Sequence, residues 1–255
     1  MLGIKHAEVL LAAGATVVLA DISQQGLANA CSRLGDAADG KLLPVVMDVG
    51  DETSIVACRE FLAKKNLVVD ILVNNAARDP KVGAGPHMQK SSRLENLDLD
   101  SFALDMRINL YGAVLCAKYF GPGMAERGSG VIINVASDLG VIAPDQRLYA
   151  RAGVPTEQQD VKPVSYSIAK HGLIGLTKYL ATYWADRGVR ANSISPGGVY
   201  AGQNDIFLSR IKQLIPLGRM AREDEYQGAI VFLSSPASSY LNGANLVIDG
   251  GRSVW

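Results

Sequence analysis

Apolar, β-branched runs alternate with longer helical patterns along the chain, and this alternation limits the possible folds more than any other feature. Most runs are nearly continuous, as in parallel strands that are buried on both faces. We expect strands at residues 15–21, 41–49, 68–76, 130–137, 189–196 and 245–250. Helical patterns cover residues 4–13, 24–34, 51–64, 98–126, 164–186 and 222–235. This order predicts a three-layer, doubly wound α/β fold with helices on both faces of one parallel sheet.

Length and composition favour one domain in a reducing compartment. The 255 residues contain no Ser/Gly-rich linker and no short repeat, so we expect a single domain over residues 1–255. The 25 basic and 25 acidic residues balance, which gives no general attraction to nucleic acid or to an anionic membrane. The three cysteines have no C-x-x-C spacing, so we interpret them as free thiols of a cytoplasmic protein. The histidines show no metal-ligand spacing, and we expect no metal.

The first expected strand ends in an acidic residue, Asp21, 18 positions after Gly3. In a dinucleotide-binding unit, an acidic residue near this spacing hydrogen-bonds the adenosine ribose. A carboxylate there also repels a 2′-phosphate, so it favours NAD over NADP. The alternative is an ordinary cap of the helix that follows.

Polar residues also end the next two strands. Asp48 is placed to accept a hydrogen bond from the adenine amino group, with a cap or turn role as the alternative. Asn74 and Asn75 begin the sequence NNAA, and buried amides need hydrogen-bond partners. We expect these amides to brace neighbouring strands and to lie against the cofactor. Val49 and Ala76, beside them in the sequence, are assigned to the same cofactor surface.

Four polar residues further along the chain form a candidate catalytic set. Ser137 ends the fourth strand, and Tyr166 and Lys170 in YSIAK are four residues apart, which places both on one side of a helix. Each has an ordinary alternative, a strand-end cap for Ser137 and a solvated pair for the other two. Asn109 lies inside a helical pattern, where its amide competes for backbone hydrogen bonds, so we expect a functional role for it.

The sequence SPGG, at residues 195–198, follows the fifth strand. It bends the backbone close to a flat group, for which the nicotinamide ring is the candidate. We assign Pro196, Gly197 and Val199 to this side of the cofactor site.

The chain resembles the single-domain branch of the short-chain dehydrogenase/reductase family from Gly3 to LVIDGG at residues 246–251. The shared motifs, in order, are Asp21, Asp48, NNAA for the usual NNAG, Asn109, Ser137, YSIAK and SPGG. The resemblance implies a Rossmann-type fold, NAD as cofactor, and a catalytic tetrad of Asn109, Ser137, Tyr166 and Lys170. It also implies a homo-oligomer, either a dimer or a tetramer, that acts on a small-molecule substrate.

The resemblance also implies roles for the tetrad in hydride transfer. A tyrosine must lose about three pKa units, worth about 4 kcal/mol, to act as a base at neutral pH. We expect the Lys170 ammonium and the positive nicotinamide ring to lower the pKa of Tyr166, which then takes the alcohol proton. Ser137 is expected to hold the substrate oxygen, Lys170 to bind the nicotinamide ribose, and Asn109 to anchor a water that carries the proton to solvent.

Two departures from the family pattern stand out. The family's opening strand and glycine-rich turn are represented only by Gly3, and the lack of a central strand leaves its neighbours with unpaired backbone groups, each costing about 1–3 kcal/mol if buried. In addition, Ser137 and Tyr166 lie 29 positions apart, farther than in most members.

The additional residues, 138–163, are polar, and we expect them to cover the active site as a lid or wall for a sugar-like or anionic substrate. We assign the candidate substrate contacts to Arg78, Asp138, Gln146 and Arg147. A solvated loop is the alternative. The sequence of the segment SDLGVIAPDQRLY also resembles that of dehydrogenases grouped with flagellin-sugar modification and, more loosely, that of gluconate-type dehydrogenases.

Three function classes follow from these observations. The first is an NAD-dependent oxidoreductase that acts on a secondary alcohol or ketone of a polar substrate. The second is a catalytically silent, cofactor-deficient protein with a structural or sensing role, against which the complete tetrad argues. The third is an epimerase or dehydratase of the extended branch, which the absence of a separate substrate domain disfavours.

Overall fold

The strands of this protein are all parallel. The computed structural model describes residues 2–35, 40–79, 82 and 92–255. Within those residues the strands are β1 (Val17–Asp21), β2 (Leu42–Val46), β3 (Ile71–Asn74), β4 (Gly130–Val135), β5 (Val189–Pro196) and β6 (Asn245–Ile248). Each strand falls within its predicted range, because continuous apolar runs are typical of strands covered on both faces.

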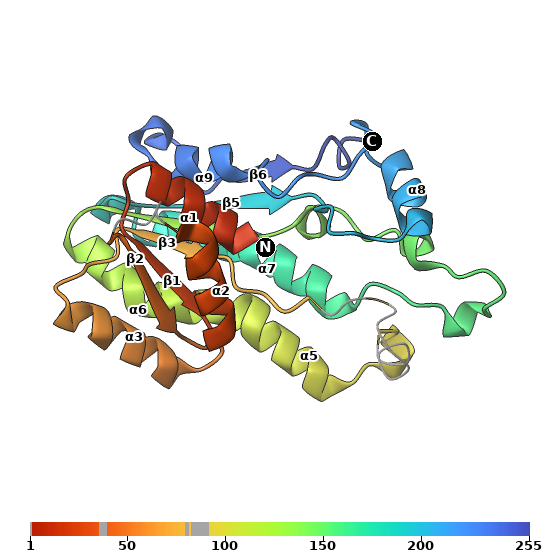
Figure 1. Cartoon of the computed structure of the whole chain (residues 1–255), viewed down its shortest axis with the longest axis horizontal. Coiled ribbons are helices and arrows are strands. Elements are labelled where there is room, and N and C mark those ends of the chain that lie inside the picture. The colour runs from red at the N-terminus through yellow and green to blue at the C-terminus, as the bar shows by residue number, and fades with distance from the viewer. Residues whose placement is uncertain (1, 36–39, 80–81, 83–91) are drawn as a thin grey trace.

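Helices cover the strands on two sides (Figure 1). One side carries α1 (Leu2–Ala12), α2 (Gln24–Leu34) and α9 (Gln227–Ser234), and the other carries α3 (Glu52–Lys64), α5 (Leu99–Met106), α6 (Gly112–Glu126) and α7 (Val164–Tyr183). An additional helix, α8 (Asp205–Gln213), lies in the long connection after β5. The predicted three-layer α/β architecture is confirmed.

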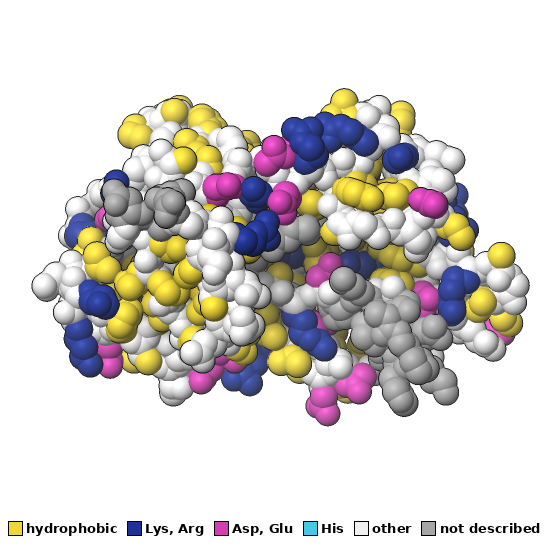
Figure 2. Space-filling view, in the orientation of Figure 1, with side chains coloured by type: hydrophobic (Ala, Val, Ile, Leu, Met, Phe, Trp, Pro, Cys, Tyr) yellow, Lys and Arg dark blue, Asp and Glu magenta, His cyan; other side chains and the backbone are white. Residues whose placement is uncertain are grey.

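The described strands form two sheets rather than the single sheet expected. β1 pairs only with β2, while β3, β4, β5 and β6 form a four-stranded sheet in that order. A cavity of about 570 Å³ separates β1 from β3, and residues of both strands line it. The fold therefore has an interruption at the position where the family's opening strand was expected to be lacking. Hydrophobic side chains are visible at the surface over the region of β1 and β2 (Figure 2).

Three helices differ from the sequence prediction, and the one expected over residues 222–235 covers only Gln227–Ser234, as α9. The helix expected over residues 98–126 is interrupted by a π-helical segment, Arg107–Tyr111, between α5 and α6. Helix α8 was not predicted. It begins after Asn204, whose side chain accepts a hydrogen bond from the Phe207 amide, and it is short enough that its periodic pattern gave no clear signal.

The largest core cluster lies between α6, α7 and the four-stranded sheet. Trp184, just after α7, is 6% exposed and packs with Met124 and Leu180. Its indole ring fits against Gly121 of α6, where an added Cβ would lie 2.2 Å from Cη2 of the ring. The small residue at position 121 thus allows the two helices to approach each other. No helix in the part of the chain that the structure describes is long and apolar enough to cross a membrane.

Two glycine substitutions test this packing. We expect Gly121→Ala to lower the free energy of unfolding by about 1–3 kcal/mol, because the added methyl group overlaps Trp184 and the residue precedes Pro122. Gly175→Ala, in the exposed part of α7 with open space around its Cβ position, should instead raise stability by up to about 1 kcal/mol. Urea unfolding of both variants measures the difference. Equal effects would contradict the packing described here.

Candidate active site

Parallel pairing brings the candidate catalytic residues to one edge of the four-stranded sheet. Ser137 follows β4, and Tyr166 and Lys170 lie in the first two turns of α7, which packs against β4 and β5. The Lys170 ammonium lies 5.7 Å from the centre of the Tyr166 ring, and the Ser137 side chain is close enough to lower the pKa of the Tyr166 hydroxyl. Three of the four predicted tetrad members are therefore brought together.

Lys170 is buried at 4% exposure. Its Nζ donates a hydrogen bond to the backbone carbonyl oxygen of Val135 at 2.8 Å, which orients the ammonium toward the end of β4. Burial lowers the pKa of Lys170 to about 8, while the nearby Asp79 carboxylate acts in the opposite direction.

The pKa of Tyr166 differs from the sequence expectation. Burial raises it above its ordinary value of 10.0, and the negative charges of Asp79 and Asp138 add to the rise, although the nearby Ser137 side chain opposes it. The predicted lowering is therefore not a property of the chain alone, because the loss of hydration outweighs the effect of a lysine 5.7 Å away. Without further positive charge, the neutral phenol is the favoured form.

Asn109 lies in the π-helical segment rather than in a regular helix. π-Helical segments inside α-helices are frequent at functional sites. The Asn109 side chain accepts a hydrogen bond from the Arg78 amide at 2.6 Å and donates one to the Arg78 carbonyl oxygen at 2.9 Å. Asn109 thus braces the chain that follows β3, and its role in a water relay stays a prediction.

The cavity between β1 and β3 is lined by part of the predicted cofactor surface. At the carboxyl end of the strands, its lining includes Gly3, Asp21, Val49, Asn75 and Ala76. Gly3 lies at the N-terminal end of α1 and so close to Asn75 that an added Cβ would stand 2.8 Å from Asn75 Nδ2. A helix N-terminus with free backbone amides attracts an anionic group such as a phosphate.

Neither acidic residue of the predicted adenosine site is a helix cap. Ser23 caps α2 and Asp51 caps α3, which removes the helix-cap alternative for Asp21 and Asp48 but leaves the turn role for Asp48. One Asp21 oxygen accepts a hydrogen bond from the Ser23 amide at 2.8 Å. Asp48 similarly accepts one from the Gly50 amide at 2.8 Å. Both side chains are thus held by the turns that follow their strands.

The predicted bracing of neighbouring strands is confirmed for Asn74. Its Nδ2 donates to Oδ1 of Asn134 on β4 at 2.9 Å, and Asn134 Nδ2 donates to the Thr177 hydroxyl of α7 at 2.8 Å. These buried hydrogen bonds tie β3 and β4 to the helix that carries Tyr166 and Lys170.

The turn after β5 is fixed by contacts with the end of the chain. The Gly197 amide donates to the Ile248 carbonyl at 2.9 Å, and the Tyr226 hydroxyl donates to the Gly197 carbonyl at 2.9 Å. Val199 pairs with Ala221 in a parallel bridge. Pro196, Gly197 and Val199 therefore lie at the same sheet edge as Ser137, although they do not line the cavity between β1 and β3.

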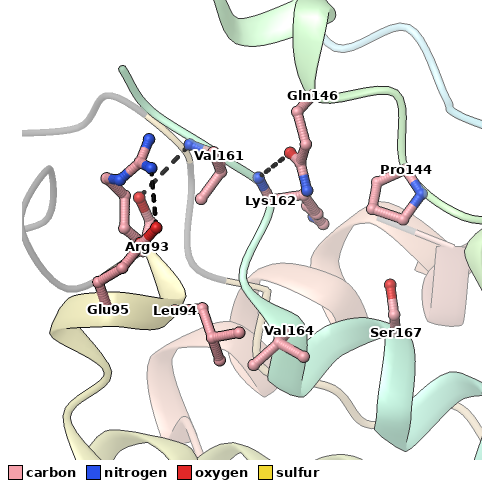
Figure 3. Close-up of a pocket in the computed structure, with 10 residues that line it drawn as sticks. Arg93, Leu94, Glu95, Pro144, Gln146, Val161, Lys162, Val164 and Ser167 are labelled. Atoms are coloured by element: carbon pink, nitrogen blue, oxygen red, sulfur yellow. Dashed lines mark hydrogen bonds and ion pairs between the residues drawn. The ribbon is translucent and has the colours of Figure 1, made fainter. Parts of the chain in front are cut away.

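The candidate substrate residues have other partners in the structure. The Arg78 guanidinium pairs with Asp105, and Asp138 is buried and pairs with Arg252. Gln146 accepts a hydrogen bond from the Lys162 amide at 2.8 Å beside a second cavity of about 350 Å³ (Figure 3). The side chain of Arg147 is 87% exposed and pairs with Asp145.

The inserted residues 138–163 are packed in part: residues 138–140 and 148 are buried, whereas residues 151–153 and 155–158 are exposed. Leu148 is buried against Ile211, Ile215 and Met220, which belong to α8 and the residues that follow it. Arg210 of α8 donates hydrogen bonds to three carbonyl oxygens of the insertion, at Arg147, Leu148 and Ala150. The insertion and the α8 region therefore pack together as one wall beside the sheet edge.

Sequence reasoning missed two charged residues near the catalytic set. The Lys162 ammonium lies 4.0 Å from the centre of the Tyr166 ring and pairs with Asp79 at 2.6 Å. Arg252, after β6, forms a buried ion pair with Asp138 at 2.7 Å. Tertiary packing alone brings Lys162 to Asp79 and Arg252 to Asp138, because these pairs are 83 and 114 residues apart in the sequence.

A pH titration of stability tests the burial of Lys170. Its pKa is about 8 in the folded chain and ordinarily 10.5, so the unfolded chain binds more protons between these values and wild-type stability rises with pH. Relative to Lys170→Met, the wild-type free energy of unfolding should therefore rise from about pH 7 to about pH 10, by at most about 3 kcal/mol. Lys178→Met, at an exposed position of α7, serves as the control. A pH-independent difference would contradict the buried ammonium.

Known proteins with similar sequences and structures include dehydrogenases that are named for polyols and sugar acids. D-threitol dehydrogenase of Mycolicibacterium smegmatis is 33% identical over 246 residues, covering 94% of this chain and 84% of that protein. Galactitol 2-dehydrogenase (L-tagatose-forming) of Cereibacter sphaeroides is 30% identical over 261 residues, covering 100% and 91%. The crystal structure of a gluconate 5-dehydrogenase from Burkholderia cenocepacia in complex with NADP and tartrate has a TM-score of 0.83 at 27% identity, covering 100% and 92%.

A family model described as enoyl-(acyl carrier protein) reductase matches residues 2–253, nearly the whole chain. Together with the relatives and the parallel α/β fold, this match establishes the family. The chain belongs to the short-chain dehydrogenase/reductase family, whose members are oxidoreductases that act on alcohol or ketone groups with a nicotinamide cofactor.

Proposed function

We propose that this protein is an NAD-dependent dehydrogenase that transfers hydride between the cofactor and a secondary alcohol or ketone of a sugar-like substrate. The observation that carries the proposal is the convergence of Ser137, Tyr166 and Lys170 at the carboxyl edge of the parallel sheet. Ligands of open α/β sheets bind at this edge.

The residues around the sheet edge suit a nicotinamide dinucleotide. Asp21 is placed for the adenosine ribose, the N-terminal end of α1 at Gly3 for the pyrophosphate, and the turn at Pro196 for the nicotinamide. Asn75 and Ala76, on the lining of the same cavity, are assigned to the part of the cofactor between its adenosine and nicotinamide ends. When bound, the cofactor accepts or supplies the hydride.

The choice of NAD over NADP rests on Asp21 of this chain. The Asp21 carboxylate lies on the cavity lining, where it would repel a 2′-phosphate. The gluconate 5-dehydrogenase with similar structure holds NADP, but its identity to this chain is 27%. A carboxylate at the end of β1 is the more direct argument, so we assign NAD as the preferred cofactor.

The protein side of the mechanism follows from the observed contacts. Tyr166 moves the proton at its hydroxyl oxygen, giving it to a ketone oxygen in reduction and taking it from an alcohol in oxidation. A half-buried, neutral phenol is already suited to the first direction. Ser137 holds the reacting oxygen, and Lys170, fixed by the Val135 carbonyl, supplies positive charge that favours the phenolate in the second direction.

Two observations favour a polyol or sugar acid as substrate. One is the polar wall formed by residues 138–163, and the other is the set of relatives named above. The relatives named above are dehydrogenases of D-threitol and galactitol, and a gluconate 5-dehydrogenase that holds tartrate. Tyr149, which packs against Phe207 of α8, and the polar side chains near Tyr166 would present hydrogen-bonding groups to hydroxyls. An apolar alcohol would leave such groups unpaired.

We also propose a cytoplasmic homo-oligomer, a dimer or a tetramer. The cysteines Cys58 and Cys116 are buried free thiols, which agrees with a reducing compartment. Tyr179 and Tyr183 on α7 stack on each other at 5.4 Å and are more than half exposed, as expected for a face that another subunit covers.

A substrate panel tests the proposed function. Purified protein with NAD should oxidise a polyol such as galactitol or D-threitol, or a sugar acid such as gluconate, far faster than an apolar secondary alcohol. Tyr166→Phe should lower turnover at least about 10³-fold, because the proton carrier is lost, while NAD affinity measured by calorimetry stays within about twofold. NAD binding without turnover of any compound, or no NAD binding at all, would favour the silent alternative. Near-wild-type turnover in Tyr166→Phe would refute the catalytic assignment.

Asp21→Ser tests the cofactor preference. Loss of the carboxylate removes a charged hydrogen-bond acceptor worth about 1.5–3 kcal/mol, so NAD affinity should fall about 10- to 100-fold while NADP affinity rises. Calorimetry with both cofactors measures the change. Asp70→Asn, directly before β3 at the amino-terminal ends of the strands, should leave both affinities unchanged. An unaltered ratio of the two affinities in Asp21→Ser would show that another residue sets the preference.

A further inference from the structure

The catalytic serine is part of a buried chain of polar contacts that reaches the C-terminal segment. The Ser137 hydroxyl donates a hydrogen bond to Oδ1 of Asp138 at 2.9 Å, and the Leu139 amide donates to the same oxygen at 2.8 Å. The other Asp138 oxygen accepts a hydrogen bond from Nη1 of Arg252 at 2.7 Å. The side chains of Asp138 and Arg252 are only 5% and 8% exposed.

The turn that carries Arg252 is itself rigidly held. After β6, Gly250 and Gly251 have φ values of +68° and +89°, a backbone region that disfavours other residues. The Asp249 carboxylate accepts hydrogen bonds from the Gly251 amide at 2.9 Å and the Ser253 amide at 2.8 Å. These contacts turn the chain back so that the guanidinium meets Asp138 beside β4.

We propose that Asp138 and Arg252 are positioning residues that act on the reaction through Ser137. A carboxylate can only accept hydrogen bonds, so Asp138 determines the direction of the Ser137 hydroxyl and holds its side chain in one orientation. Arg252 neutralises that carboxylate. The C-terminal segment after β6 thereby completes the active site. Because Ser137 is assigned through the proposed function, the inference rests on that proposal.

Charge explains why the arginine is needed. Asp138 is close enough to raise the pKa of Tyr166, so its negative charge reaches the reacting centre. Both directions of the reaction place negative charge on the substrate oxygen or on Tyr166 near the transition state, and a bare carboxylate would oppose it. Removal of one partner of a buried ion pair also leaves the other uncompensated. Arg252 therefore both fixes Asp138 and limits its electrostatic effect on Tyr166.

A double-mutant cycle tests the kinetic part of the proposal. With galactitol and NAD, we expect Arg252→Met to lower kcat about 10- to 100-fold with little change in the KM for NAD, and Arg252→Lys to recover part of the loss. In a Ser137→Ala background, Arg252→Met should cost less than about threefold further, because the positioning of Ser137 is gone and only the effect of the Asp138 charge on Tyr166 remains. Equal losses in both backgrounds would overturn the inference.

A matched control separates this effect from the general loss of an ion pair. Arg222→Met removes an exposed pair with Asp224, at 3.2 Å, and should leave kcat unchanged. Asp138→Asn, which keeps the shape of the side chain and removes its charge, should make Arg252→Met nearly neutral when the two are combined. Thermal melting of each variant identifies any that fail to fold, and Arg252→Lys then replaces Arg252→Met in the cycle.

Crystal structures of the variants test the positioning itself without substrate or turnover. In Arg252→Met, and in Asp138→Asn/Arg252→Met, we expect the Ser137 side chain to leave its wild-type orientation or to occupy more than one. In Arg252→Lys it should keep one orientation. An unmoved Ser137 in Arg252→Met would refute the inference even if wild-type turnover is high. If the wild type instead turns over no substrate, the proposed function fails, and the structures still decide the positioning role.

Discussion

The candidate active site depends on the parallel pairing of β3, β4 and β5. Their register places Asn74 beside Asn134 and aligns the carboxyl ends of all three strands. Each strand is followed by a segment that carries site residues, so backbone hydrogen bonding alone brings Asn75, Ser137 and Pro196 to one edge. The amide contacts from Asn74 through Asn134 to Thr177 then attach helix α7, and with it Tyr166 and Lys170, to the same edge.

The electrostatics of the site are set by burial more than by any single charge. Burial lowers the pKa of Lys170 and raises that of Tyr166, so it disfavours both ionised forms that alcohol oxidation requires. Charged side chains from distant segments lie around these two residues: Asp79 with Lys162, and Asp138 with Arg252. Because each acid is paired with a base, the charges of the two ion pairs nearly cancel near Tyr166. Removal of one partner would leave an uncompensated charge there.

The interruption between β1 and β3 is the main structural departure from a continuous doubly wound sheet. The 570 Å³ cavity there extends from the cofactor residues at the carboxyl end to the opposite end of the strands, and His6 on its lining has both ring nitrogens buried without a hydrogen-bond partner. Burial lowers the pKa of this imidazole to about 4, so it remains neutral there at physiological pH.

Sequence patterns by themselves determined the strands, the α/β class and the catalytic candidates. Continuous apolar runs, the four-residue spacing of Tyr166 and Lys170, and polar residues at strand ends all have local physical causes. The partners of Arg78, Asp138 and Gln146, the π-helical setting of Asn109, the raised pKa of Tyr166 and the approach of Arg252 to Ser137 were decided only by the tertiary structure. These features depend on burial and on contacts between segments up to 114 residues apart, which a local pattern does not encode.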